Sequence, residues 1–303
     1  GRSPYELYAG IDVESNGYNT SVNWNAVVPE GQPHVTSIGF YRPEWTYNAS
    51  TSLSDFYARD NKFWVGQNGD PSNTTTTSNW KGVANYIPAN SPITTVPWVT
   101  NFCTGQGHFY ASAGTVFSTS DWNNLSLQDV LPTWRWIVRT SGAPLDVALD
   151  FDDAYFGGSS LLVSGTLDAT NDVLLYETNL DVVSGTQLSV MFKPAQTGPT
   201  HMQVGYAFAD APTTFEYADT LDATSTDWQY VAIGLGAADA GRTLAAISLR
   251  FVDTGTPMPY QMRIGQIAVT ADVEFPEPPK NVTVVEMHEI DAHAATVRLK
   301  WDA

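Results

Sequence analysis

The chain has 303 residues, of which 43% are hydrophobic and 12% aromatic, so it can bury sizeable cores and is long enough for about two domains. Fourteen Lys and Arg stand against 32 Asp and Glu, and the resulting net charge of −18 disfavours nucleic acid and anionic membrane surfaces as partners. Cys103 is the only cysteine, which excludes an intrachain disulfide, and no apolar run approaches the about 18 residues of a membrane span.

The first zone, to about residue 97, follows a strand and helix pattern. Residues 7–13 and 35–41 are nearly continuous apolar runs, which are typical of strands buried on both faces of a parallel sheet. Residues 54–64 place aromatic side chains at helical spacing, with Ser54 or Asp55 as the expected N-cap. The Gly-, Asn-, Ser- and Thr-rich stretch at 68–78 is expected to be a loop.

The second zone, residues 98–275, consists of short alternating segments separated by turn signals, with no long helical period. This pattern predicts an antiparallel β-sandwich of the jelly-roll type. The clearest strand candidates are residues 161–164, 188–192, 202–208 and 247–251.

The third zone starts at a proline-rich acidic linker, residues 274–279. Residues 282–284 and 295–301 then alternate as two strands, the second ending in a Trp expected to belong to a core, which resembles the opening of a fibronectin type III domain. Because two strands cannot close a sandwich, we expect the protein to be longer than this chain.

Several sequence segments resemble those of the endo-β-N-acetylglucosaminidases of glycoside hydrolase family 85, which cut the chitobiose core of N-linked glycans. They are residues 1–13, 39–45, 63–66 with 69–71, and 124–136. The resemblance implies a multidomain protein with α/β and all-β parts. Residues 1–97 would be the end of a (β/α)₈ TIM barrel, residues 98–275 a jelly-roll, carbohydrate-binding-like sandwich, and residues 276–303 the start of a fibronectin III-like domain.

In such a barrel the strands at 7–13 and 35–41 would be the seventh and eighth, and active sites lie at the carboxyl ends of the strands. The resemblance therefore implies substrate-binding roles for Asp12, Tyr41, Arg42, Glu44 and Trp45. Four of them have a specific structural alternative: Asp12 and Arg42 as an ion pair, Glu44 as a loop cap, and Trp45 as a packing residue.

The family mechanism is substrate-assisted and retaining: the 2-acetamido group of the sugar forms an oxazoline, an Asn orients it, and a Glu two residues later is the general acid and base. No Asn in this chain has Glu two positions later. We therefore expect the pair upstream, in the missing amino-terminal half of the barrel, and expect this chain alone to be inactive. Neither a cofactor nor a metal is expected, and the partners would be N-linked glycans or glycoproteins.

The sandwich zone supports a second hypothesis, a non-catalytic carbohydrate-binding or adhesin-type protein. Trp122, Trp134 and Trp136 either present faces to sugar or pack a core. Asp152 and Asp153 offer hard oxygen ligands that suit a structural Ca²⁺. The composition is typical of a secreted or cell-surface bacterial protein whose signal peptide is not in this chain, with the cytoplasm as the alternative.

Overall fold

The computed structural model forms two compact units, Gly1–Ala271 and Asp272–Ala303. The finer division of the first unit at residue 98 stays a prediction. The structure describes residues 3–73, 75, 79–87, 91–132, 135–271, 279–291 and 294–302, so the linker expected at 274–279 lies outside the described residues except for Pro279.

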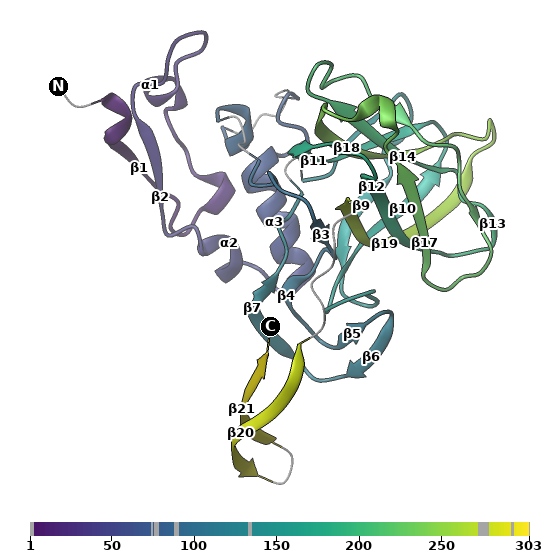
Figure 1. The fold of residues 1–303 in the computed structure, drawn as a ribbon. Coiled ribbons are helices and arrows are strands. Elements are labelled where there is room, and N and C mark those ends of the chain that lie inside the picture. Colours follow the sequence, from purple (N-terminus) through teal and green to yellow (C-terminus); the bar gives the residue numbers. More distant parts are fainter. Residues whose placement is uncertain are drawn as a thin grey trace. The chain divides into compact units, whose positions relative to one another are not determined.

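The amino-terminal part of the first unit contains a parallel strand pair. Strand β1 (Tyr8–Asp12) pairs with β2 (Ser37–Tyr41) in parallel, with Asp12 opposite Tyr41 (Figure 1). Between them the chain passes through the short helix α1 (Trp24–Val27). The prediction of two parallel strands is confirmed, and the parallel direction brings both carboxyl ends to the same edge of the sheet.

Two helices follow β2, namely α2 (Trp45–Asn48) and α3 (Leu53–Val65). The N-cap of α3 is Ser52, whose hydroxyl accepts a hydrogen bond of 3.1 Å from the Asp55 backbone N–H, so the cap predicted at Ser54 or Asp55 was wrong. Ser52 has extended φ and ψ angles, as an N-cap requires, whereas Ser54 and Asp55 already lie within the helix.

A small core joins the strand pair to α3. Its buried members come from β1 and the residue after it, from α1, from α3 and from the segment after α3: Ile11, Val13, Trp24, Phe63, Trp80 and Val83. Ile38 and Phe40 of β2 pack against them. Trp80 is fully buried, and its indole N–H donates to the Phe63 carbonyl oxygen at 2.9 Å. At Gly66, where α3 ends with φ of +88°, a Cβ would lie 2.5 Å from the Lys81 carbonyl oxygen, so only glycine fits there.

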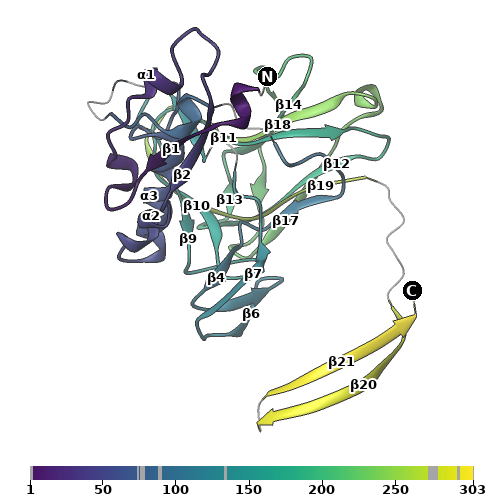
Figure 2. The same ribbon diagram turned by 90° about the vertical axis from the view of Figure 1, so that its left-hand side faces the viewer.

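The rest of the first unit is a β-sandwich of two antiparallel sheets (Figure 2). The first sheet has the order β17-β12-β19-β10-β9, with β3 also beside β19, and its strands are β3 (Trp98–Thr100), β9 (Asp146–Asp150), β10 (Ser160–Leu167), β12 (Gln187–Pro194), β17 (Gln229–Gly234) and β19 (Met258–Thr270). The second has the order β15-β14-β18-β11-β8, and its strands are β8 (Ile137–Thr140), β11 (Asn171–Asp181), β14 (Met202–Phe208), β15 (Glu216–Tyr217) and β18 (Thr243–Phe251).

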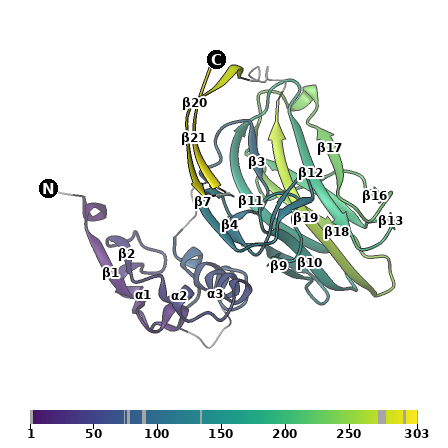
Figure 3. The same ribbon diagram turned by 90° about the horizontal axis from the view of Figure 1, so that it is seen from below.

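One large core lies between the two sheets, whose strands are drawn in Figure 3. Leu161, Val190 and Ile264 enter it from the first sheet, and Val173 and Leu249 from the second, all fully buried. Burying one such side chain contributes about 1.5–3 kcal/mol, so this core dominates the stability of the unit. The predicted β-sandwich is confirmed, and each of its four clearest strand candidates lies within β10, β12, β14 or β18.

Smaller strands extend from the sandwich. β4 pairs with β7, β5 with β6 and β13 with β16, in three two-stranded sheets. Their bounds are β4 (Thr104–Gly107), β5 (Tyr110–Ser112), β6 (Thr115–Ser118), β7 (Trp122–Gln128), β13 (Gly198–Pro199) and β16 (Asp222–Ala223).

The second unit is a hairpin of β20 (Lys280–Asp291) and β21 (Ala294–Asp302), paired antiparallel. Two strands were predicted here, but Trp301 is 55% exposed rather than part of a core. A hairpin alone has no second layer against which the ring can pack, and the fibronectin III-like assignment stays a prediction.

Candidate functional site

The carboxyl ends of β1 and β2 place two of the predicted site residues directly opposite each other. Asp12 and Tyr41 are register partners, and the Val13 backbone N–H donates to the Tyr41 carbonyl oxygen at 3.1 Å, which extends the parallel pairing past both strands. Tyr41 is 57% exposed and Asp12 is also exposed. Their polar side chains are thus presented at one edge of the sheet, where they are available to a ligand.

Arg42 connects the two strand ends. Its Nη1 lies 3.0 Å from Glu14 Oε1, and its Nε donates to Glu44. Asp12 instead accepts a hydrogen bond of 2.9 Å from the Glu14 backbone N–H. The suggested Asp12–Arg42 ion pair is therefore not formed. Glu14, Arg42 and Glu44 form a charged cluster at the strand ends, and Glu14 was not predicted from the sequence.

The charges in this cluster stabilise one another. The hydrogen bond from Arg42 holds the pKa of Glu44 below its ordinary value, against the opposing effect of burial. The same hydrogen bond, with the charges of Glu14 and Glu44, raises the pKa of Arg42. A carboxyl group with a lowered pKa is ionised at neutral pH, so Glu44 is suited to accept hydrogen bonds from hydroxyls and not to act as a general acid.

Glu44 and Trp45 begin helix α2. Glu44 occupies the N-cap position but makes no side-chain capping hydrogen bond, because its carboxylate is directed to Arg42. Trp45 is half-buried, and its indole nitrogen is buried with no hydrogen-bond partner among the described residues. This partial burial is compatible both with packing under the loop and with one ring face available for stacking.

The other candidates are not brought to this site. Trp136 is 7% exposed and lies in the sandwich core cluster, as the packing alternative proposed. The Trp122 indole N–H donates to the Phe109 carbonyl oxygen, and its ring meets Tyr110 edge to face. Trp134 lies outside the described residues.

Metal ligation and membrane insertion find no structural support in the described part of the chain. Asp153 is 2.7 Å from Lys193 Nζ and thus already has a cationic partner, while Asp152 is exposed. No cluster of three His, Cys, Asp or Glu side chains among the described residues is arranged to hold a metal ion. None of the described helices combines the length and the apolar character that crossing a membrane requires.

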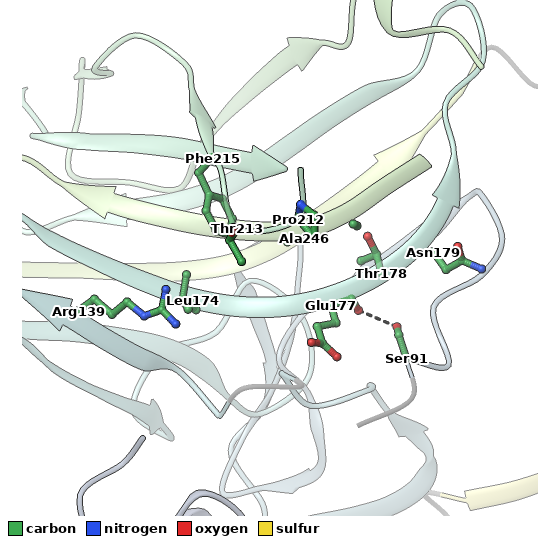
Figure 4. A pocket seen from close by; sticks show the side chains of 11 residues that line it. Ser91, Arg139, Leu174, Glu177, Thr178, Asn179, Pro212, Thr213, Phe215 and Ala246 are labelled. Carbon is green, nitrogen blue, oxygen red and sulfur yellow. Dashed lines mark hydrogen bonds between the residues drawn. The ribbon is translucent and has the colours of Figure 1, made fainter. Parts of the chain in front are cut away.

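A cavity of about 630 Å³ lies elsewhere, on the sandwich (Figure 4). Its lining comes from β8, β11 and β18, the segment around Ser91, and the loop that follows β14. No sequence pattern predicted this cavity, because it depends on how three strands and two connections meet.

Comparisons with known proteins agree with the resemblance. Residues 1–110 match the family described as glycosyl hydrolase family 85. The chain is 27% identical over 217 residues to the human cytosolic endo-beta-N-acetylglucosaminidase, covering 66% of this chain and 25% of that protein. The Danio rerio protein of the same name is 24% identical over 194 residues, covering 62% and 25%.

A solved structure extends the likeness to nearly the whole chain. The glycoside hydrolase domain of Endo-D from Streptococcus pneumoniae R6 superposes with a TM-score of 0.84 at 30% identity, over 99% of this chain and 48% of that one. The chain thus spans about a quarter of the length of these curated relatives and about half of the solved domain. The resemblance to the family 85 endo-β-N-acetylglucosaminidases is confirmed.

Proposed function

Because residues 1–110 match glycosyl hydrolase family 85, we propose that the chain is part of an enzyme that cleaves the GlcNAc-β-1,4-GlcNAc core of N-linked glycans. The observation that carries this proposal is the parallel pairing of β1 with β2, which sets Asp12 opposite Tyr41 at the carboxyl ends. Enzymes with a (β/α)₈ barrel have their active sites at the carboxyl ends of the barrel strands. N-linked glycans or glycoproteins are the corresponding partners.

We assign β1 and β2 to the seventh and eighth strands of a (β/α)₈ barrel. A two-stranded parallel sheet is not stable alone, because strands of this kind are normally covered on both faces. Leu7 and Tyr8 are 53% and 71% exposed. Exposing such apolar surface to water is unfavourable, which supports a further layer of protein packed against this strand pair. The missing amino-terminal half of the barrel is the partner that this assignment requires.

The mechanism we propose is substrate-assisted and retaining. The carbonyl oxygen of the 2-acetamido group attacks the anomeric carbon as the bond to the leaving GlcNAc oxygen breaks, and a general acid protonates that oxygen. Water then attacks the anomeric carbon of the oxazolinium ion, and the same residue, now a base, removes the proton. The Asn and Glu that orient the amide and transfer the proton would lie upstream of residue 1.

Within this scheme the residues of the chain bind and orient the sugar. The Tyr41 hydroxyl is the donor at the strand end, and Asp12 is an acceptor beside it. Arg42, fixed by Glu14 and Glu44, keeps the second strand end in place and offers its remaining N–H groups to sugar oxygens. Trp45 supplies an aromatic face for the apolar side of a pyranose ring.

The experiment compares this chain alone with a longer polypeptide in which a family 85 barrel segment containing Asn-x-Glu precedes it. We expect the chain alone to release no glycan from a high-mannose glycopeptide, as followed by mass spectrometry, and the longer protein to release it. In the longer protein, Tyr41→Phe is expected to lower kcat/KM about tenfold or more, since one oriented hydrogen bond is lost.

Tyr47→Phe is the matched control, because Tyr47 is 55% exposed on α2 and its ring packs edge to face against Phe56 of α3. Equal activity of Y41F and the unmodified longer protein would remove Tyr41 from the site. Glycan release by the chain alone would contradict the upstream location of the catalytic pair.

The names of the curated relatives favour a cytoplasmic location for the whole protein and give no support to secretion. A purely adhesive sandwich protein is the alternative function, and the parallel strand pair is the feature that it leaves unexplained.

A further inference from the structure

The cavity on the sandwich lies across the outer face of the second sheet. Its floor is Leu174 on β11 with Ala245 and Ala246 on β18, and the two small alanine side chains leave room above the sheet. Phe215, half-buried on the loop after β14, forms one wall (Figure 4). Its volume of about 630 Å³ falls in the range of natural ligand sites.

A β-bulge aims polar side chains into this cavity. Glu177 pairs with Ala246 and Leu180 with Leu244, so Thr178 and Asn179 together stand opposite the single residue Ala245. In a regular strand consecutive side chains alternate between faces, yet Glu177, Thr178 and Asn179 all line the cavity. Bulges of this kind redirect side chains and are frequent beside functional sites.

The bulge is held by the segment near Ser91. The Ser91 hydroxyl donates to the Glu177 carbonyl oxygen at 2.6 Å (Figure 4). The Asn179 backbone N–H donates to the Ile93 carbonyl oxygen at 2.8 Å. The Thr178 hydroxyl donates to the Leu244 carbonyl oxygen at 2.6 Å. These contacts hold the backbone of the bulge, from which Glu177 and Asn179 contribute to the lining of the cavity.

Arg139 adds a cation at the other end of the lining, on β8. It is exposed and takes part in no ion pair with a described residue, whereas Arg250 on the same face binds Asp172 through two hydrogen bonds of 2.6 and 3.1 Å. In a chain with 18 more acidic than basic side chains, an Arg that lines a cavity and pairs with no acidic side chain among the described residues can donate its N–H groups to a ligand.

We propose that this face of the sandwich is a second glycan-binding site, which takes a short neutral oligosaccharide. Phe215 meets the apolar face of a sugar ring, while Arg139 and Asn179 bind its hydroxyls. Arg139 and Glu177 carry opposite charges, so neither a strongly anionic nor a cationic ligand is favoured.

A peptide is the less suitable occupant. Peptides that bind sheets add a strand to an open edge, but β18 is paired on both sides, and β11 beyond Leu174, where β8 no longer pairs with it, is hydrogen-bonded to residues 91 and 93. The lining also mixes charged, amide and small apolar groups, where an amphipathic helix needs a continuous apolar groove. A ring with one apolar face and a rim of hydroxyls matches this mixture.

The test titrates the chain itself with chitotetraose, mannotetraose and a free high-mannose N-glycan, followed by ¹⁵N NMR shifts and calorimetry. At least one probe is expected to bind with a Kd of about 1 mM or tighter, shifting residues of β8, β11 and β18. Phe215→Ala and Arg139→Gln are each expected to weaken that binding about tenfold, and Arg139→Lys less.

Two matched controls make the same chemical changes elsewhere. Phe117→Ala removes a ring that is 71% exposed on β6, and Arg298→Gln removes a cation that is 74% exposed on β21. Both are expected to bind like the unmodified chain, and unchanged thermal midpoints in all variants show that the fold is retained.

The proposal is overturned if no probe gives a saturable shift at about 10 mM, if F215A and R139Q bind as well as the controls, or if a peptide competes equally. Binding here requires no hydrolysis, so this test is independent of the glycan-release experiment and either result can fail alone.

Discussion

Arg42 occupies a backbone conformation that few side chains adopt. Its φ is +61°, in the left-handed region where a Cβ crowds the backbone. Such a conformation persists only where the surroundings hold it, and here Glu14 and Glu44 fix the guanidinium from two sides. The position directly after β2 thus combines backbone strain with converging charges, an arrangement that is frequent where side chains are held ready for a ligand.

Ser52 determines where α3 begins. Ser52→Ala removes the acceptor for the Asp55 backbone N–H and is expected to lower the free energy of unfolding by about 1 kcal/mol. Ser54→Ala is the control, since Ser54 lies within the helix and alanine has the higher helix propensity, so that variant is expected to be neutral or slightly stabilised. Urea unfolding of both variants checks the assignment, and a larger loss for S54A would contradict it.

Helix α3 is the element that connects the parallel strands to the sandwich. Its Phe63 enters the small core, whereas Tyr57 belongs to the sandwich core cluster. On the sandwich side Asp60 lies 3.4 Å from Arg135, and both side chains are less than one fifth exposed, at 19% and 17%. Burial raises the pKa of Asp60, and the positive charge of Arg135 opposes that rise. The helix therefore depends on one ionic contact that is mostly removed from water.

Arg135→Gln removes the compensating charge. The pKa of Asp60 then rises further above its unfolded value, so the native state binds its proton more tightly and loses stability as the pH rises through that range. We expect a loss of about 2 kcal/mol at pH 7 and a smaller one near pH 4, where Asp60 takes up the proton.

Thermal unfolding of R135Q at both pH values checks this expectation. Arg59→Gln is the control on the same helix, because Arg59 pairs with Asp55 at 3.0 Å in a more exposed i,i+4 contact, worth about 0.5 kcal/mol or less. A loss for R135Q that is equal at pH 4 and pH 7 would show that Asp60 does not carry the effect.

The strands were the most predictable elements, and the contacts between elements were the least. Continuous apolar runs indicated the parallel pair, and alternation placed β14 at the predicted residues. The bulge in β11 follows from tertiary hydrogen bonds to residues 91–93, which no local period encodes. Glu14 was missed for a similar reason: a carboxylate just past a strand end acquires its partner only when β2 brings Arg42 beside it.

At the scale of the whole chain, like charge opposes folding. A net charge of −18 on 303 residues exceeds what the local ion pairs neutralise, so the native state carries a repulsion that the expanded chain relieves. The Arg residues at 42, 59, 135, 242, 250 and 263 each have an acidic partner, and these contacts are short-ranged. The long-range repulsion should therefore dominate the response to salt.

Raising NaCl from about 20 mM to about 300 mM shortens the screening length from roughly 20 Å to roughly 6 Å. We expect the thermal midpoint of the chain at pH 7 to rise by a few degrees, because repulsion between distant carboxylates is screened more than the paired contacts are. The same titration near pH 4.3, the pI of the sequence, is the control, since the net charge there is close to zero and the rise should vanish. A midpoint that falls with salt at pH 7 would mean that the ion pairs, led by Asp60–Arg135, outweigh the repulsion.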